Sequence, residues 1–227
     1  MFERDYIMRM LTSFTAVVAR LMGLRKEMKH EQVFVVVNET LEKYYRLNSK
    51  MIQSLTDRNL LELLSSNGEL DNEKAITVAY LLKAEGESYE ALGSTDESYK
   101  RYLTALTLYT AAIQNDAVLE EIDILHEIDD LLIRLQSYQL PAPYLLQLFD
   151  YYNKIEQYDA AENKLFELVE AEPIIENAVT LDISLKGVKF YKKLLQLDDA
   201  ELIAGGLPRS EVLDGLEQFK QKASITE

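Results

Sequence analysis

Cysteine is absent from this chain of 227 residues, and its absence excludes several kinds of chemistry. Without a thiol the protein forms no disulfide, binds no metal through thiolates and has no cysteine nucleophile. The absence also fits a reducing compartment, so we expect a cytoplasmic protein. With 48% hydrophobic and 28% charged residues, the chain is long enough for one large globular domain or two small ones.

Sequence signatures of catalysis are also missing. The chain contains no phosphate-cradling glycine loop, no dinucleotide fingerprint, no His-Glu-x-x-His motif and no Gly-x-Ser-x-Gly motif. One acidic segment offers four candidate metal ligands on one helix face, namely Asp123, His126, Glu127 and Asp130. A metal site would need ligands from a second helix, however, and the only other histidine is the distant His30. We therefore expect a solvated acidic helix, no cofactor and no enzymatic activity.

Basic residues are scarce outside the N-terminal segment. The chain has a net charge of -15, yet residues 1–30 contain six basic and three acidic residues and carry +3, so the remainder carries -18. A nucleic-acid surface needs clustered lysine and arginine to replace counterions, and an acidic body of this size argues against one. We expect no nucleic-acid partner.

The N-terminal segment has no apolar run long enough to cross a bilayer, because Arg9 and Arg20 interrupt it, and no cleavage site typical of a signal peptide. It is instead periodic and predicts an amphipathic helix over 4–24. The residues of its apolar stripe are Ile7, Met10, Leu11, Phe14, Val17, Val18, Leu21 and Leu24. Three roles are open to this stripe: it covers the first hairpin of the body, docks on a second copy of the chain, or lies on an anionic membrane. The need to cap the first hairpin argues against the membrane.

Helical periodicity continues almost to the end, and the few glycines and prolines fall between the periodic segments. We predict helices over 4–24, 30–48, 57–66, 72–93, 95–115, 118–138, 143–156, 159–172, 175–197 and 208–222. The β-branched run "QVFVVVN" at 32–38 also belongs to a helix, since its apolar stripe continues into the next turns and no partner strand is evident. In "SSNGELD", both flanks are helical, so we predict a left-handed helix stop at Asn67 or Gly68 and an N-cap at Asp71, with neither a hairpin nor a calcium loop.

Small and aromatic residues alternate across 86–106 as in two closely packed helices. Gly93 ends one helix, and Ser94 with Glu97 has the spacing of a capping box for the next, so the connection is very short. Helices joined so tightly need small residues where they cross and large flat ones beside them. The residues that fit this pattern are Gly86, Tyr89, Ser98, Tyr102 and Ala105.

This pattern resembles the tetratricopeptide repeat, a helix-turn-helix unit of 34 residues. Leu82, Gly86, Tyr89 and Gly93 match its first helix and turn, while Glu85 replaces the expected leucine. A second copy is best matched at Tyr158, Ala161, Leu165, Leu168 and Pro173, departs at Phe149 and Glu156, and is followed by a fragment with Gly187 and Phe190. Three segments, "MFERDYIMRM", "LLSSNGELD" and "GGLPRSEVLDGL", are similar to an uncharacterised bacterial family of tetratricopeptide-like proteins.

The resemblance implies an all-α right-handed superhelix of antiparallel helix hairpins. We expect a single domain, 1–227, with N-terminal helices at 1–70, repeats at 71–200 and a capping helix at 201–227. In the family, first helices line a groove that holds a peptide or a partner's helix. The corresponding positions here are Lys83, Glu87, Glu90, Ala91, Leu146, Asp150, Asn153 and Lys154. Such an acidic floor favours a basic or amphipathic partner, although these acids also fit an ordinary solvated face.

Two functional hypotheses follow. The first is a non-catalytic scaffold that binds a peptide or protein in this groove. The second is a structural protein that self-associates, with the basic helix 4–24 of one copy docked on the acidic body of another.

Overall fold

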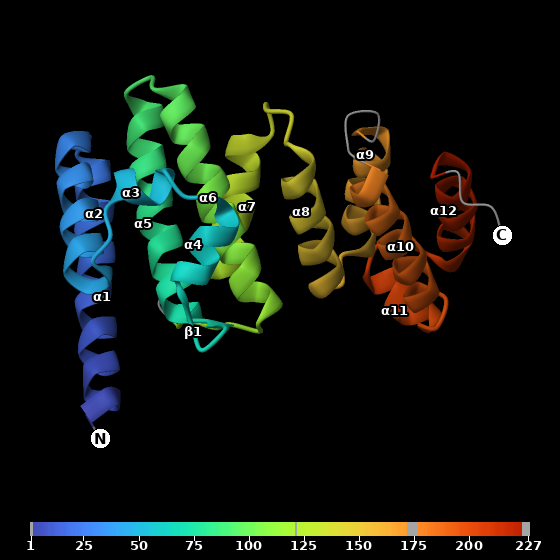
Figure 1. Ribbon diagram of the computed structural model, residues 1–227, viewed down its shortest axis with the longest axis horizontal. Helices are drawn as coiled ribbons and strands as arrows, with labels where there is room; N and C mark the ends of the chain where they lie inside the picture. The colour runs from blue at the N-terminus through green and yellow to red at the C-terminus, as the bar shows by residue number, and fades with distance from the viewer. Residues whose placement is uncertain (1, 121, 172–176, 224–227) are drawn as a thin grey trace. The chain divides into compact units, whose positions relative to one another are not determined.

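The computed structural model describes the backbone of residues 2–120, 122–171 and 177–223, and the side chains of 14–120, 122–171 and 183–223. These residues form an all-helical protein, as predicted, with one small β-hairpin in addition (Figure 1). The chain divides into two compact units, Met1–Tyr138 (unit 1) and Gln139–Glu227 (unit 2). The division falls inside the repeat region expected at 71–200 of a single domain.

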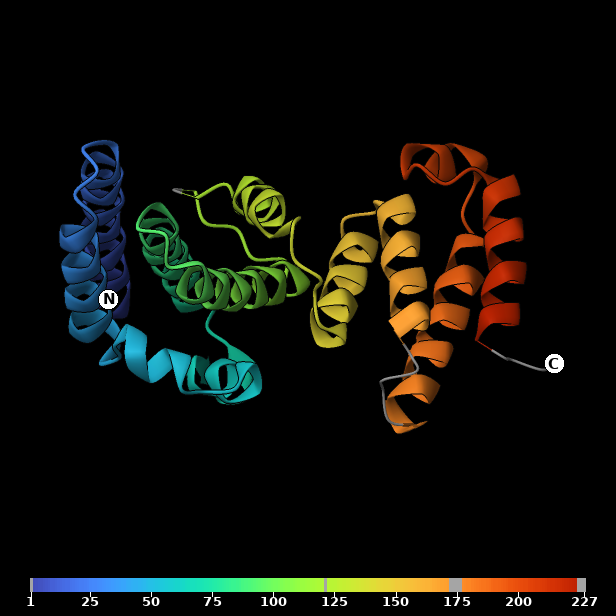
Figure 2. The ribbon, with the colours of Figure 1, turned by 90° about the horizontal axis from the view of Figure 1, so that it is seen from above.

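Unit 1 is built around one helix that is buried on all sides. Its elements are α1 (Phe2–Lys26), α2 (His30–Tyr45), α3 (Ser49–Gln53), α4 (Asp57–Leu63), β1 (Ser65–Ser66), β2 (Glu69–Leu70), α5 (Asn72–Ala91), α6 (Thr95–Gln114) and α7 (Ile124–Leu135). Figure 2 shows α5 beside α1 and α2 on one side and α6 on the other, and α5 also contacts α7. Every residue from Ala75 to Ser88 is buried, so the charged side chains of this stretch must find partners inside the protein.

The close packing predicted for α5 and α6 is confirmed. A Cβ atom at Gly86 would lie 2.7 Å from Cε1 of Tyr102, and Ser98 and Ala105 of α6 are buried. The connection is short, with Gly93 at φ 77. The predicted capping box at Ser94 is wrong, because the Ser94 side chain makes no cap hydrogen bond and the Glu97 carboxylate is paired with Lys100 and Arg101.

The segment "SSNGELD" is a β-hairpin, so the prediction of a helix stop without a hairpin is wrong. Strands β1 and β2 pair in an antiparallel manner, and Asn67 and Gly68 have φ values of 55 and 84. Two consecutive positive φ values suit a two-residue Asn-Gly turn, whose twist matches that of the strands. The N-cap prediction for Asp71 is confirmed, since its side chain accepts a hydrogen bond from the backbone N–H of Lys74.

The N-terminal helix is present and packs on α2 and α5 within unit 1. Phe14 and Leu21 of its predicted stripe are buried, and the Phe14 ring meets Tyr80 of α5 edge-on. The side chains of Ile7, Met10 and Leu11 lie outside the described residues. Within the described part of the chain, no helix combines the length and apolar character that a membrane span requires.

Unit 2 packs a cluster of aromatic and aliphatic side chains between five helices. These helices are α8 (Ala142–Lys154), α9 (Tyr158–Ala171), α10 (Asn177–Leu194), α11 (Asp199–Ala204) and α12 (Arg209–Lys222). The predicted core positions Tyr158, Ala161, Leu165 and Leu168 are all buried, while Pro173 lies outside the described residues. The turn before α9 places Glu156 at φ 61, where glycine is usual in the repeat.

All ten predicted helices are present, and two short ones, α3 and α11, were not predicted. The helix expected from residue 118 begins only at Ile124, because the Asp123 side chain caps it by accepting a hydrogen bond from the backbone of His126. The run "QVFVVVN" lies within α2, as predicted.

Candidate functional site

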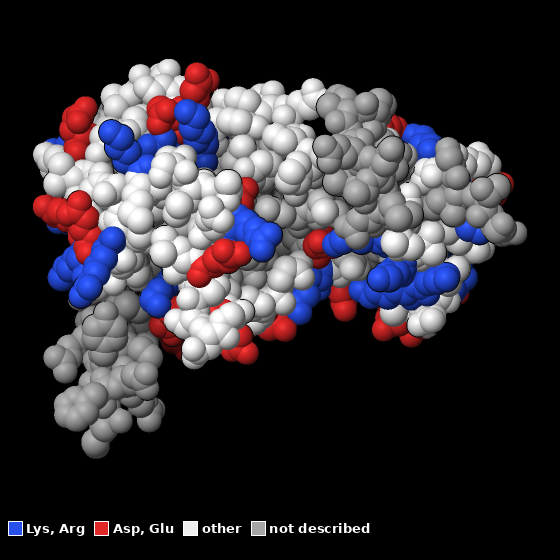
Figure 3. All heavy atoms as spheres, viewed as in Figure 1, with Lys and Arg blue, Asp and Glu red and all other residues white. Residues whose placement is uncertain are grey.

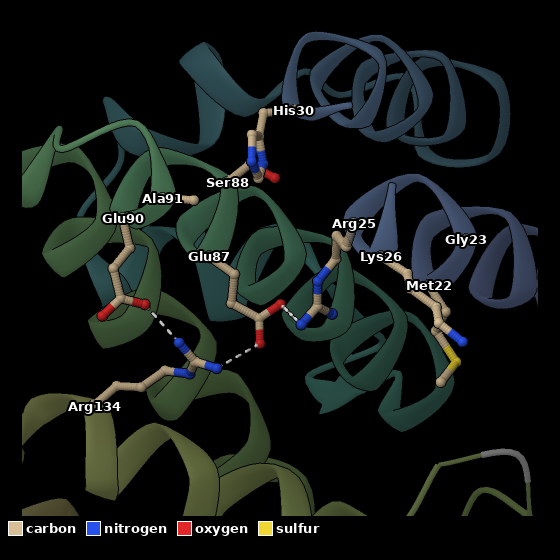
Figure 4. A pocket seen from close by; sticks show the side chains of 10 residues that line it. All are labelled: Met22, Gly23, Arg25, Lys26, His30, Glu87, Ser88, Glu90, Ala91 and Arg134. Carbon is tan, nitrogen blue, oxygen red and sulfur yellow. Dashed lines mark hydrogen bonds and ion pairs between the residues drawn. The ribbon is translucent and has the colours of Figure 1, made fainter. Parts of the chain in front are cut away.

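One concave feature of unit 1 is an open groove of about 800 Å³ between the α1–α2 connection and helices α5 and α7. The residues that line it are Met22, Gly23, Arg25, Lys26, His30, Glu87, Ser88, Glu90, Ala91 and Arg134. Figure 4 shows Met22 and Lys26 at one end, Glu90 and Arg134 at the other, and Glu87 with Arg25 in the middle. We call this feature the unit 1 groove.

Glu87 lies at the centre of the groove and joins three helices. Its side chain is 7% exposed and is paired with Arg25 of α1 and, at 3.3 Å, with Nη2 of Arg134 of α7. Arg134 also pairs with Glu90 on the next turn of α5. Segments that are distant in sequence are therefore connected through one buried carboxylate, which the low local dielectric makes sensitive to loss of any partner.

Lys83 lies one turn before Glu87 and lines a smaller cavity of about 220 Å³ that shares Arg25, Glu87 and Arg134 with the groove. Its Nζ atom is 2.6 Å from Oε2 of Glu127 and 2.8 Å from Oδ2 of Asp130. The alternative of an ordinary solvated acidic face is therefore wrong for Glu87, and the neighbouring Lys83 is buried as well. Both are buried, because α7 covers this face and supplies their partners.

The acidic helix α7 uses its carboxylates as ion partners. Glu127 and Asp130 bind Lys83, while Asp123 caps the helix, so three of the four candidate metal ligands have structural roles. Among the described residues no cluster of three or more His, Cys, Asp or Glu side chains could hold a metal ion. His126 lines the smaller cavity from its exposed position.

Burial shapes the ionisation of these groups. Desolvation raises the pKa of Glu87, although Arg25, Lys83 and Arg134 oppose the shift. Burial would also raise the pKa of Asp130, but hydrogen bonds from Arg134 and Lys83 bring it below its ordinary value. Desolvation, with Glu127 nearby, raises the pKa of Tyr80 to about 12. The phenol is neutral near neutral pH, and no free base results from this network.

Glu90 and His30 complete the walls of the groove. The Tyr102 hydroxyl donates to Oε2 of Glu90 at 2.7 Å, and the Glu90 side chain remains 45% exposed. His30 begins α2 and lies next to Ser88 (Figure 4). Its Nδ1 atom is buried and has no hydrogen-bond partner among the described residues. A buried polar atom of this kind is a position where a ligand or a water can bind.

The other predicted groove residues belong to α8 of unit 2. Asp150 is paired with Lys186, with Oδ2 2.7 Å from Nζ, and Asn153 accepts a hydrogen bond from Lys193 at 3.0 Å. Leu146 is partly buried against the core of unit 2, and Lys154 is exposed. The structure therefore places the two halves of the predicted site in two different units.

A family model described as a family of unknown function (DUF6483) matches residues 1–224, nearly the whole chain. The chain belongs to the DUF6483 family. No curated protein and no solved structure matches it. The function of this DUF6483 protein must therefore be inferred from its own residues.

Seven groove residues of this DUF6483 protein were not predicted from its sequence, namely Met22, Gly23, Arg25, Lys26, His30, Ser88 and Arg134. The unusual concentration of basic residues near Arg25 was visible, but nothing indicated that its partner would be Glu87. Arg134 lies on the strongly amphipathic α7. As a single arginine among acidic residues, it could have suggested an ion pair with a buried carboxylate of another helix.

Replacing Glu87 by glutamine tests the buried carboxylate of the DUF6483 chain. Since its pKa is raised, the folded state binds a proton more readily than the unfolded state, so its contribution to stability grows as the pH falls and is lost as the pH rises through the folded pKa. We expect the free energy of unfolding of the wild type, relative to Glu87→Gln, to be larger at about pH 5 than at about pH 7 in urea titrations. A difference that does not change with pH would contradict this, and Glu69→Gln, at an exposed carboxylate, is the control.

Proposed function

We propose that this protein is a non-catalytic binding module that holds a segment of a peptide or protein in the unit 1 groove. The observation that carries the proposal is the groove itself, an open concavity of about 800 Å³ whose walls come from α1, α2, α5 and α7. That volume is in the range of ligand sites in proteins and is large enough for several side chains of a bound segment.

The ion pairs of the groove floor support this proposal. Glu87 is fixed between Arg25 and Arg134, so the walls keep their shape without a ligand, and a preorganised site loses less entropy on binding. The apolar side chain of Met22 is 59% exposed at one end and offers a contact for an apolar residue. Methionine side chains adapt well to varied partners.

Charge chemistry favours binding over catalysis. The buried carboxylates and Lys83 are paired with one another, and Tyr80 and Tyr102 have pKa values raised by burial, so these groups have no free base or nucleophile among them. The hairpins α5–α6 and α8–α9 fit the proposed kinship with tetratricopeptide-like repeats, whose superhelical arrangement remains part of this proposal.

The partner need not be basic. The sequence suggested an acidic floor, but Glu87 faces two arginines and Lys83 is paired with two carboxylates, so the floor supplies its own counter-charges. On the face drawn in Figure 3, basic and acidic side chains are interspersed over both units. Complementarity must therefore come from the unpaired groups of the groove.

Self-association through the N-terminal helix is a weaker proposal. Over its described side chains, α1 buries Phe14 and Leu21 in its own unit, and Arg25 is engaged with Glu87. These groups are therefore occupied within one copy of the chain.

A groove-filling variant tests the proposed function. Ala91 is exposed at the end of α5 and lines the groove, so Ala91→Trp should occupy the space without disturbing the core. We expect proteins that the wild type captures from a lysate of the source organism to be reduced at least about tenfold with Ala91→Trp, because a bulky side chain excludes a bound segment. The matched control is Ala200→Trp, on the exposed face of α11 in unit 2, which should capture them as the wild type does. Equal capture by both variants would overturn the proposal.

A further inference from the structure

The charges that line the unit 1 groove leave one cation without a carboxylate. Arg25 and Arg134 are paired with Glu87 and Glu90, whereas no carboxylate of the described part of the chain is paired with Lys26. Apart from His30, the lining residues carry three positive and two negative charges. The groove therefore has the opposite sign from the chain, whose net charge is -15.

His30 adds a second unsatisfied group. Its Nδ1 atom is buried without a hydrogen-bond partner among the described residues, and the ring lines the groove beside Ser88. In its neutral form one ring nitrogen donates and the other accepts, so a bound segment could satisfy Nδ1 with a polar group of either kind. This observation is independent of the excess charge.

The negative body of the protein does not oppose an acidic ligand inside the groove. At physiological ionic strength the Debye length is about 8 Å, so charges farther away are largely screened. The local pairing decides the preference, and an unpaired lysine at the groove wall favours a carboxylate.

We propose that the segment bound in this groove is acidic and amphipathic, with a carboxylate side chain on Lys26 and an apolar side chain on Met22 and Ala91. The inference rests on the proposed function and specifies its partner. It reverses the preference for a basic partner that the sequence suggested, because the carboxylates of α5 are already neutralised.

Three synthetic peptides test this inference. They share one length and one pattern of leucines, and their polar positions carry glutamate, lysine or glutamine. Fluorescence anisotropy with the full chain should show binding of the glutamate peptide, weaker binding of the glutamine peptide and the weakest binding of the lysine peptide. We expect Lys26→Glu to weaken the glutamate peptide about fivefold, as expected for loss of one exposed pair together with new repulsion.

The control is Lys50→Glu, the same charge change at an exposed lysine of α3, which should leave the affinity unchanged. Circular dichroism of each variant verifies that it folds. An equal loss in the Lys50→Glu variant would show that net charge, and not the groove, governs binding, and would overturn the inference.

The remaining outcomes separate this inference from the proposed function. If the lysine or glutamine peptide binds at least as tightly and Ala91→Trp abolishes that binding, the groove binds segments but the acidic preference is wrong. If the glutamate peptide binds and Ala91→Trp has no effect, the groove assignment itself fails. If none of the three peptides binds, the inference is overturned. It is also overturned if the protein self-associates and Lys26→Glu abolishes that self-association, because the occupant of the groove is then a second copy. In both cases the capture experiment still tests the proposed function.

Discussion

Replacing Arg101 by methionine is expected to lower the free energy of unfolding by about 3–5 kcal/mol, the usual effect of breaking a buried ion pair. The side chains of Arg101 on α6 and Glu85 on α5 are 6% and 3% exposed, and Nε lies 3.4 Å from Oε2. Without the guanidinium, the Glu85 carboxylate keeps only the Ser49 hydroxyl as a described hydrogen-bond partner in a site that excludes water. Urea unfolding followed by circular dichroism measures the loss.

The double variant Arg101→Met with Glu85→Leu is the decisive control for this prediction. Leucine is the residue expected at position 85 from the repeat pattern, and two apolar side chains leave no buried charge. We expect the double variant to recover to within about 1–2 kcal/mol of the wild type, since replacing both partners is often nearly neutral. A double variant as unstable as the single one would mean that Arg101 acts through packing on Tyr89 and not through the ion pair.

Glu85 illustrates where sequence reasoning ended. The pattern around it predicted the α5–α6 hairpin correctly, because the repeat pattern itself contains Gly86, the turn glycine Gly93 and the aromatic position Tyr102. The glutamate was recognised only as a departure from the pattern. Its reason is a buried partner on another helix, which no local rule reveals.

The same limit applies to the groove. Local spacing places Glu87 and Glu90 on one face of α5, but whether that face meets solvent depends on which helix packs on it. Helix α7 covers it with Glu127, Asp130 and Arg134, so Lys83 and Glu87 are buried. Prediction of such contacts requires the tertiary arrangement, whereas helix ends and turns follow from neighbouring residues.

The hairpin at 65–70 shows a different kind of failure. The sequence contained a signal for the turn and a signal for the start of the next helix. Asn-Gly is the preferred pair for a two-residue hairpin turn, and Asp71 caps the helix that follows. The helical flanks were given more weight than the turn residues. Each strand is only two residues long, too short to produce an alternating apolar pattern.

Replacing Gly187 by leucine is expected to destabilise unit 2 by about 3–5 kcal/mol, comparable to losing a buried phenylalanine from a core. A Cβ atom at this position of α10 would lie 2.8 Å from Cε2 of Phe219 and closer still to two other ring atoms. Phe219 on α12 is fully buried and packs on the rings of Phe166 and Tyr191. Since a rigid ring cannot yield by small shifts, a leucine must displace it and with it the contact between α10 and α12.

Two further variants separate this steric effect from a change in helix propensity. Gly23→Leu makes the same substitution within α1, where a Cβ atom meets nothing within 4 Å, and should be neutral or stabilising by up to about 1 kcal/mol. Gly187→Leu combined with Phe219→Ala returns space to the core, so it should be more stable than Gly187→Leu alone, with a coupling that opposes the single losses. Urea midpoints for the three variants decide the matter, and a Gly187→Leu midpoint equal to that of the wild type would refute the close packing of α10 on α12.

The repeat pattern singled out Gly187 for its spacing from Phe190, yet the ring that requires glycine is Phe219, on the final helix of the unit. A glycine within a helix is thus not sufficient evidence of close packing, since Gly23 meets nothing, and the group that packs on Gly187 is identified only by the fold.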